Sequence, residues 1–365
     1  MASYLQSSSN RLGYLDWLRG AAAVIMLQGH VIHSFTEKGS REGAAYVLSQ
    51  FAGGIAPAVF LFLTGVTLAF LMASRERQGL APAARVRAAL KRSGYLFGVA
   101  FLFRAQLFLT GLPDNHWTDL FKVDILNAMG LAILLFSPIA AMTAEMRVRI
   151  GAALGLAIAA AAPLVSQLDL SWLHPFARNY FVPDFNLFTF FPWAAFVAFG
   201  ISAGSILRLA GQANTQRLMQ WSALAGLALI VGGRYFSELP YSFYEKSEFW
   251  LNSPMLVLIK LGVLLVALPF AFLWTSHGVG NRWSWVSQLG TTSLLVYWVH
   301  IELVYGRWFG AWKESVPVAQ CVFASVVLIA AMLALSIIRT RWQSIRTALA
   351  SFGSLPPAPE RVSGD

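Results

Sequence analysis

Long apolar segments alternate with short polar ones along almost the whole chain. Each apolar segment holds roughly twenty residues, the length that an α-helix needs to cross about 30 Å of hydrocarbon. Lipid offers no hydrogen-bond partners, so each segment must satisfy its own backbone as a helix. The pattern predicts an all-α, polytopic integral membrane protein with about ten transmembrane helices. The expected spans are 15–35, 48–73, 94–111, 123–142, 149–166, 187–208, 218–233, 253–274, 284–305 and 316–338.

Composition agrees with this pattern. Hydrophobic residues make up 57% of the chain, charged residues 12%, and the mean hydropathy is +0.60, whereas a soluble domain carries about 25% charged residues. We expect one membrane-embedded domain over 1–345 and a disordered cytoplasmic tail over 346–365, which is rich in Pro, Ser and Gly. The N-terminal sequence lacks the basic start and cleavage site of a signal peptide, so the first span is expected to be retained.

The net charge of +10 does not point to nucleic acid, because the Lys and Arg residues lie between the apolar runs and form no basic groove with interleaved aromatics. The connection "SRERQGLAPAARVRAALKR" between the second and third spans is dense in Arg, which predicts that it faces the cytoplasm. Both termini are then cytoplasmic. The aromatic outer loops fit either an acceptor surface or a membrane-interface belt. The sequence leaves a homodimer open.

The first span, "LDWLRGAAAVIMLQGHVIHSF", carries four ionisable groups: Asp16, Arg19, His30 and His33. Arg19 and His30 are separated by about three helical turns, a rise of roughly 16 Å, so they share one face. Such a stripe must face protein or water instead of lipid. Arg19 is expected near the inner side and His30 toward the outer side. Simpler roles stay open, with Asp16 as a helix cap, Arg19 reaching the headgroups, and structural hydrogen bonds for the histidines.

Other polar residues occur at depths where they can meet this stripe. His300 and Glu302 lie near the outer end of the ninth span, and Arg104 and Lys260 are further cations within apolar segments. Weaker candidates on the outer side are Asn127, Asp184 and Asn186, each of which also suits a cap or turn. His116, His174 and His277 have no metal-ligand spacing, and no metal site is predicted. The single cysteine, Cys321, is expected to pack within an apolar run.

The second span begins with "FAGGIAPAVFLFLTG", which contains Gly53, Gly54, Pro57 and Gly65. Small residues of this kind allow close helix approach, and Pro57 is expected to kink the helix. Such a kink can open room for an extended ligand beside the first span. Packing alone explains the same residues.

Four segments of the chain, in the same order, resemble segments of a known protein family. "LDWLRGAAAVIMLQGHVIHSF", "FAGGIAPAVFLFLTGVTLAFLM", "FTFFPWAAFVAFGISAG" and "GTTSLLVYWVHIELVYG" resemble bacterial proteins related to heparan-α-glucosaminide N-acetyltransferase. The Arg, ten residues, His spacing is also similar to that of membrane O-acyltransferases acting on envelope glycans. The resemblance implies a location in a bacterial inner (plasma) membrane. It also implies transfer of an acyl group, most simply acetyl, from cytoplasmic acyl-CoA to a sugar amine or hydroxyl of an extracytoplasmic glycan or glycolipid.

The resemblance also gives the polar residues roles. Arg19, beside Asp16, would hold a CoA phosphate or pantetheine oxygen. His30 would meet the thioester as a general base or form an acyl-imidazole, and the sequence does not separate these routes. His33 and His300 would assist it, while Arg104, Glu302, Asn127 and Asp184 would contact the acceptor. The animal enzyme's proposed active histidine follows this helix, but "SFTEKGSREGAAY" has none.

Two rival functions fit parts of the same pattern. A transporter or flippase could use a buried Arg and His as a proton relay. A membrane scaffold would need no reaction at all, and it predicts that His30 can be replaced without consequence.

Overall fold

The computed structural model describes residues 12–182, 188–211, 213–280 and 282–353, and the side chains as far as residue 342. Within these ranges the fold is all-helical. The one extended pairing among the described residues is an isolated bridge between Thr36 and Val316. Asp184, a predicted acceptor residue, and Asn186, a weaker candidate on the outer side, lie outside the described residues.

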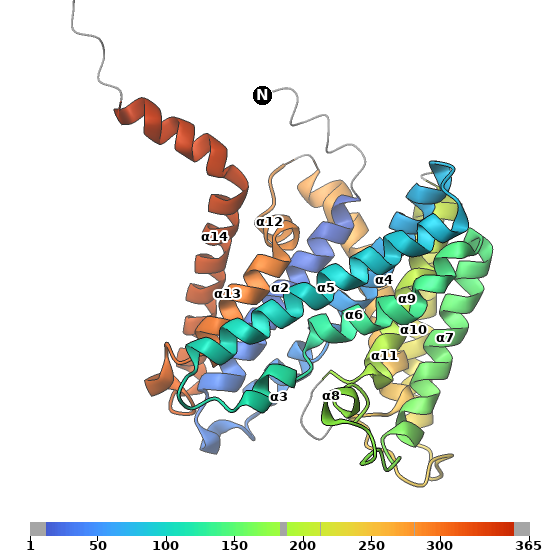
Figure 1. Cartoon of the computed structure of the whole chain (residues 1–365), viewed down its shortest axis with the longest axis horizontal. Coiled ribbons are helices and arrows are strands. Elements are labelled where there is room, and N and C mark those ends of the chain that lie inside the picture. Colours follow the sequence, from blue (N-terminus) through green and yellow to red (C-terminus); the bar gives the residue numbers. More distant parts are fainter. Residues whose placement is uncertain (1–11, 183–187, 212, 281, 354–365) are drawn as a thin grey trace, which may run out of the picture.

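The long helices alternate in direction across one bundle (Figure 1). In chain order, the elements that build it are α2 (Gly13–Phe35), α3 (Ala44–Gly53), α4 (Ala56–Arg77), α5 (Pro82–Thr110), α6 (Ile125–Phe136), α7 (Ala144–Val165), α8 (Pro175–Arg178), α9 (Phe190–Ala210), α10 (Thr215–Ser237), α11 (Pro254–Leu273), α12 (Trp285–Thr291), α13 (Ser293–Tyr305) and α14 (Val318–Gly353). Short 3₁₀ turns follow α2, precede and follow α6, and follow α13, at Lys38–Ser40, Trp117–Phe121, Ser137–Ala141 and Gly310–Trp312, and a π-helical turn, Trp274–Val279, extends α11.

Six stretches within the described residues are long and apolar enough to cross a membrane: Ala44–Arg77, Pro82–Thr110, Ala144–Val165, Phe190–Ala210, Pro254–Val279 and Val318–Trp342. Two shorter apolar stretches, Ile125–Ala141 and Ser293–Tyr305, accompany them. The chain is therefore an integral membrane protein. The expected ten spans also include α2 and α10, which are not among these stretches; the polar stripe of α2 lowers its mean hydropathy. The ten-span arrangement stays a prediction.

The two ends of the described chain lie on one side of the bundle. Figure 1 shows the start of α2, the turn between α4 and α5, and the far end of α14 at the top, with α3 and α8 at the bottom. α14 continues to Gly353, into the segment that was expected to be disordered; residues 354–365 lie outside the described residues. A shared side for both ends agrees with the predicted topology and leaves open which compartment that side faces.

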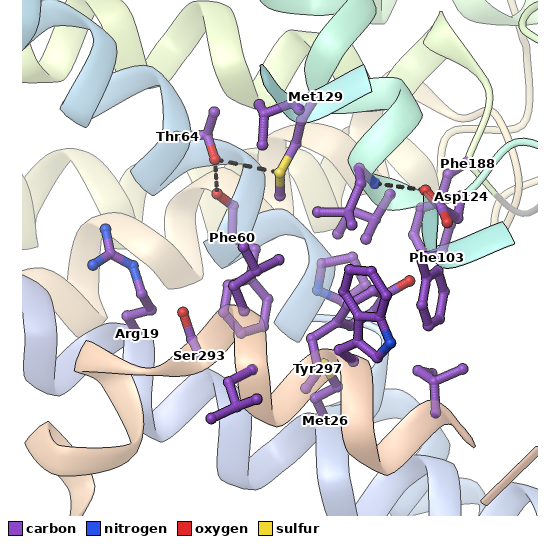
Figure 2. Close-up of a pocket in the computed structure, with 18 of the residues that line it drawn as sticks. Arg19, Met26, Phe60, Thr64, Phe103, Asp124, Met129, Phe188, Ser293 and Tyr297 are labelled. Atoms are coloured by element: carbon purple, nitrogen blue, oxygen red, sulfur yellow. Dashed lines mark hydrogen bonds between the residues drawn. The ribbon is translucent and has the colours of Figure 1, made fainter. Parts of the chain in front are cut away.

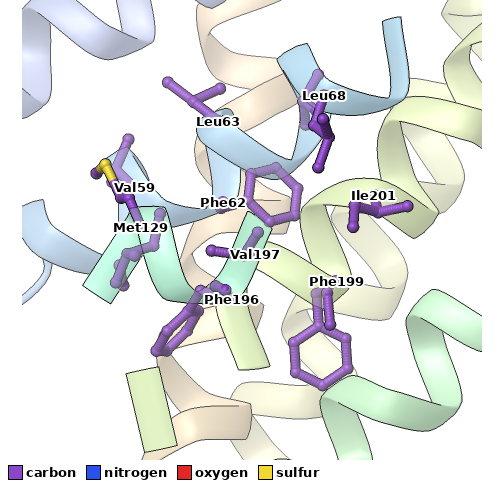
Figure 3. Packing of buried hydrophobic residues seen from close by; sticks show 14 of the residues in the cluster. Val59, Phe62, Leu63, Leu68, Met129, Phe196, Val197, Phe199 and Ile201 are labelled. Atoms are coloured by element: carbon purple, nitrogen blue, oxygen red, sulfur yellow. The ribbon is translucent and has the colours of Figure 1, made fainter. Parts of the chain in front are cut away.

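Close packing of α4 against α9 forms the centre of the core (Figure 3). Gly65 and Gly200 face each other there. A Cβ added to Gly65 would lie 2.1 Å from the carbonyl oxygen of Val197, and one added to Gly200 would lie 2.0 Å from that of Phe62. Only glycine fits this approach, which agrees with the predicted packing role of Gly65.

The expected kink at Pro57 is a break between two helices. α3 ends at Gly53, and α4 begins at Ala56 with Pro57 in its first turn, where proline needs no hydrogen-bond partner. α3 is tied to α2, because Ser49 donates to the side chain of Gln28 at 2.9 Å and Gln50 donates to the Gly29 carbonyl at 3.2 Å.

Charged residues that were expected in a loop are partly buried. The predicted Arg-dense connection ends early, since α5 begins at Pro82 and Arg85 is 8% exposed. The carboxylate of Glu76 on α4 contacts Arg85 at 3.1 Å and Arg147 on α7 at 2.5 Å. Arg147 also donates to the Met142 carbonyl, and Arg85 to that of Ala141, both at 3.0 Å. Glu76, Arg85 and Arg147 form an ionic cluster that joins three helices.

Candidate active site

An elongated cavity of about 1540 Å³ lies between α2, α4, α5, α6 and α13. Its wall is mainly apolar. Figure 2 shows Arg19 and Ser293 toward one end and Asp124, Phe103 and Phe188 toward the other. The polar or charged lining residues on the side where α2 begins are Arg19, Arg92, Thr291, Thr292, Ser293, Arg339 and Thr340, and those nearer the other side are His30, Arg104, Lys122, Asp124 and Tyr305.

His30 lines this cavity and contacts a second histidine from a distant part of the chain. Its Nδ1 is 2.9 Å from Nε2 of His300, and the two rings stack with an interplanar angle of 14°. His300 is fully buried on α13, and its Nδ1 lies 2.8 Å from the carbonyl oxygen of Val296. α2 and α13 thus bring the two predicted histidines together.

These contacts assign the tautomers of the pair. A carbonyl oxygen can only accept, so Nδ1 of His300 carries its proton. In a neutral imidazole the other nitrogen then accepts, and Nδ1–H of His30 donates to Nε2 of His300. Nε2 of His30 is left with its lone pair. This is the nitrogen that a general base or a nucleophile would use.

His33 lies one helical turn further along α2, exposed and outside the cavity lining. Its Nδ1 is 3.2 Å from the hydroxyl of Tyr305, whose ring packs edge-on against His30 with 5.4 Å between centroids. Tyr305 itself lines the cavity. It joins the two α2 histidines, and the sequence analysis did not identify it.

Arg19 and Asp16 form an ion pair on α2, with 3.2 Å between Nη1 and Oδ1. Arg19 lines the cavity and Asp16 does not. The N-cap of α2 is Leu12, so Asp16 is not the helix cap. Arg92 and Arg339, on α5 and α14, also line the cavity, where they are exposed. Sequence reasoning did not single out these two arginines, because each lies just outside an expected span, 94–111 for Arg92 and 316–338 for Arg339.

Arg104 on α5 lines the cavity and faces Asp124, with 3.5 Å between Nε and Oδ2. Asp124 caps α6: its Oδ1 accepts from the backbone N–H groups of Leu126 at 2.9 Å and Asn127 at 3.1 Å. The Asn127 side chain completes this capping box and donates to the Tyr180 hydroxyl at 3.3 Å. Asn127 is buried and does not line the cavity. The spacing in "DILN" is a capping signal that points to Asp124.

Glu302 lies beside the cavity and not on its wall. Its carboxylate accepts from Gln106 at 2.9 Å, from Thr110 at 3.4 Å and from Trp308 at 3.1 Å. Gln106 in turn accepts a hydrogen bond from Trp298 of α13. Glu302 therefore connects α5 to α13.

Lys260, the other buried cation predicted from the sequence, lies away from the cavity, with its Nζ 4.9 Å from the ring centroid of Trp193. Cys321 is fully buried and packs with Val31, Ile32, Phe35 and Val304, as expected. Among the described residues, no three His, Cys, Asp or Glu side chains are placed to hold a metal ion.

Comparison with known families gives one match. Residues 11–237 match the model of the heparan-alpha-glucosaminide N-acetyltransferase catalytic domain. No curated protein matches the chain. The matched region covers α2 to α10 and includes Arg19, His30 and Arg104, whereas His300 and Tyr305 lie beyond it. Because the match spans more than half of the chain, the protein belongs to the heparan-α-glucosaminide N-acetyltransferase family, whose members are membrane acetyltransferases.

Proposed function

We propose that this protein transfers an acyl group, acetyl in the simplest case, from cytoplasmic acyl-CoA to an amine or hydroxyl of an extracytoplasmic glycan or glycolipid. One observation carries the proposal. A single cavity is lined by Arg19 toward one side of the bundle and by His30 toward the other. On one helix the two residues are separated by a rise of roughly 16 Å. A donor and an acceptor can thus meet from opposite sides.

The donor suits the end of the cavity that holds Arg19. Arg19, Arg92 and Arg339 line it together with the hydroxyls of Thr291, Thr292 and Ser293. Guanidinium groups bind phosphate oxygens through paired, charge-assisted hydrogen bonds, so this end fits the phosphates of CoA. The apolar wall beyond, which includes Phe60, Leu68 and Met129, fits the pantetheine arm.

The chemistry then takes place at Nε2 of His30. As a general base, this nitrogen accepts the proton of the acceptor hydroxyl or amine while the acceptor oxygen or nitrogen attacks the thioester carbonyl carbon. The carbon–sulfur bond breaks, and the imidazolium returns the proton to the leaving thiolate, giving CoA and the acylated acceptor. The hydrogen bond from Nδ1–H of His30 to Nε2 of His300 fixes the orientation of the His30 ring and stabilises its positive charge in the imidazolium form. An acyl-imidazole would form at the same nitrogen, so both routes remain open.

A transfer assay tests the proposal. With protein in liposomes and acetyl-CoA supplied on one side, we expect release of CoA that depends on a glycan acceptor on the other. His30→Ala should slow transfer by about 10²- to 10⁴-fold, the usual effect of losing a general base, while thermal unfolding and acyl-CoA binding stay unchanged. Transport of a substrate without CoA release would instead support a transporter. Full activity of His30→Ala would refute the histidine mechanism.

The direction of transfer needs its own test. In a background without Cys321, single cysteines at Gln78 and Lys38, both exposed, should label from opposite sides of the membrane. We expect Gln78 to label from the cytoplasm and Lys38 from outside, and the reverse would invert the proposed direction.

A further inference from the structure

The cavity has a second pair of charged groups that the chemistry above does not use. Asp124 is 4% exposed, and its Oδ2 makes no hydrogen bond within the described structure. Nε of Arg104, 3.5 Å away, likewise makes none. Both residues line the cavity that contains His30. A buried carboxylate and the buried Nε of a partly exposed guanidinium are thus in contact with hydrogen-bonding capacity left over, and such capacity is costly to leave unused.

The free capacity defines the chemistry of a ligand. The carboxylate can only accept and the guanidinium can only donate. An anion would satisfy Arg104 alone, and an ammonium would satisfy Asp124 alone. A hydroxyl group, which both donates and accepts, can bridge the two. Adjacent hydroxyls on one ring can do so while leaving the ion pair in place.

The surroundings agree with a ring that carries hydroxyls. Phe103, Tyr297 and Trp298 form neighbouring parts of the cavity wall, with ring centroids of Phe103 5.5 Å from Tyr297 and 5.3 Å from Trp298. Figure 2 shows Phe103 and Phe188 beside Asp124, at the end of the cavity opposite Arg19. Aromatic faces offer a flat apolar surface against which the C–H groups of a sugar can pack.

We infer that Asp124 and Arg104 form the acceptor subsite, and that it binds a pyranose through its ring hydroxyls. This inference rests on the proposed function for the identity of the acceptor. The position of the Asp124 carboxylate is fixed, because its Oδ1 accepts hydrogen bonds from two backbone N–H groups at the start of α6. The free Oδ2 is therefore fixed relative to α6, which is the condition for discriminating one hydroxyl from another.

The variant Asp124→Asn tests this subsite. Asparagine is also a good N-cap, so α6 keeps its cap while the negative charge is lost. The readouts are binding of methyl glucoside, measured by saturation-transfer NMR on protein in nanodiscs, and KM for both substrates. We expect Asp124→Asn to weaken glycoside binding and raise the acceptor KM by about ten- to hundredfold, with the acyl-CoA KM and Tm unchanged.

Asp114→Asn, the same change at an exposed loop residue outside the cavity, is the matched control and should behave as the parent protein. Deoxy analogues sharpen the test, because an analogue without the bridging hydroxyl should bind the parent protein more weakly and Asp124→Asn no differently. Equal glycoside binding by parent and Asp124→Asn, or none by either, would overturn the subsite whatever the activity. Glycoside binding that depends on Asp124 without any transfer would leave the subsite standing and refute the proposed function.

Discussion

Two regions of this protein contain buried charged groups, and they differ in what those groups contact. In the cluster of Glu76, Arg85 and Arg147, each guanidinium contacts the shared carboxylate and a backbone carbonyl from a neighbouring connection. In the other region, Arg104 contacts Asp124 at 3.5 Å, and both residues line the cavity of about 1540 Å³. The cluster lies outside the cavity lining, whereas the Arg104–Asp124 pair has room for a ligand beside it.

Burial within the protein does not by itself distinguish a functional charge from a structural one, because Arg147 is more deeply buried than Arg104, with side chains 1% and 19% exposed. What distinguishes them is the set of partners. A charge whose partners are all protein groups holds helices together, and a charge beside a cavity is available to a substrate.

The largest expected effect lies in the ionic cluster. Arg147→Met should lower the free energy of unfolding by about 1.5–3 kcal/mol, because Glu76 loses its charge-assisted hydrogen bond with Arg147 while its partly exposed carboxylate keeps Arg85. The double variant Glu76→Gln with Arg147→Met should be no more stable than Arg147→Met, because the buried Arg85 guanidinium then loses its carboxylate partner too. Thermal unfolding in detergent measures both. A folded Arg147→Met with unchanged Tm but a changed KM would break the comparison, because it would place this cluster among the functional charges.

Sequence reasoning located the α2 side of the cavity and part of the facing side, where Arg104 was a candidate and Asp124 was not. The first span, predicted over 15–35, is α2, and Arg19 and His30 both line the cavity as their shared helical face required. This succeeded because helical periodicity relates residues within one segment. Asp124, Tyr305 and Gln106 were missed, since each gains its meaning from contacts with residues far away in sequence.

Helix boundaries show the same limit. Hydropathy predicted one continuous span over 48–73 and another over 284–305. The structure divides the span over 48–73 into α3 and α4, and the span over 284–305 into α12 and α13. Each break is only one or two residues long, at residues 54–55 and at residue 292, so a hydropathy window does not register it. The start of α5 was placed too late because Arg85, which looks like a loop residue, is neutralised by Glu76.

A smaller effect is expected at Arg19, on the functional side of the comparison. Arg19→Lys keeps the charge but loses the planar fork that binds a phosphate through two hydrogen bonds. We expect the acyl-CoA KM to rise by roughly tenfold, with kcat and the acceptor KM nearly unchanged. Steady-state kinetics with each substrate varied in turn measures this. Arg75→Lys, at the end of α4 and outside the cavity lining, is the matched control. An unchanged acyl-CoA KM together with a lower Tm would show that Arg19 stabilises the fold and does not bind the donor.

The smallest effect is expected at His33, the histidine of α2 that does not line the cavity. Its hydrogen bond with Tyr305 is exposed, and losing one such bond costs about 1 kcal/mol at most. His33→Ala should therefore keep transfer within about fivefold of the parent, since 1 kcal/mol corresponds to roughly that factor. Tyr305→Phe removes the same hydrogen bond and keeps the ring against His30, so it should match His33→Ala. An inactive His33→Ala beside an active Tyr305→Phe would assign His33 a role in the reaction itself and move the chemistry toward the exposed end of α2.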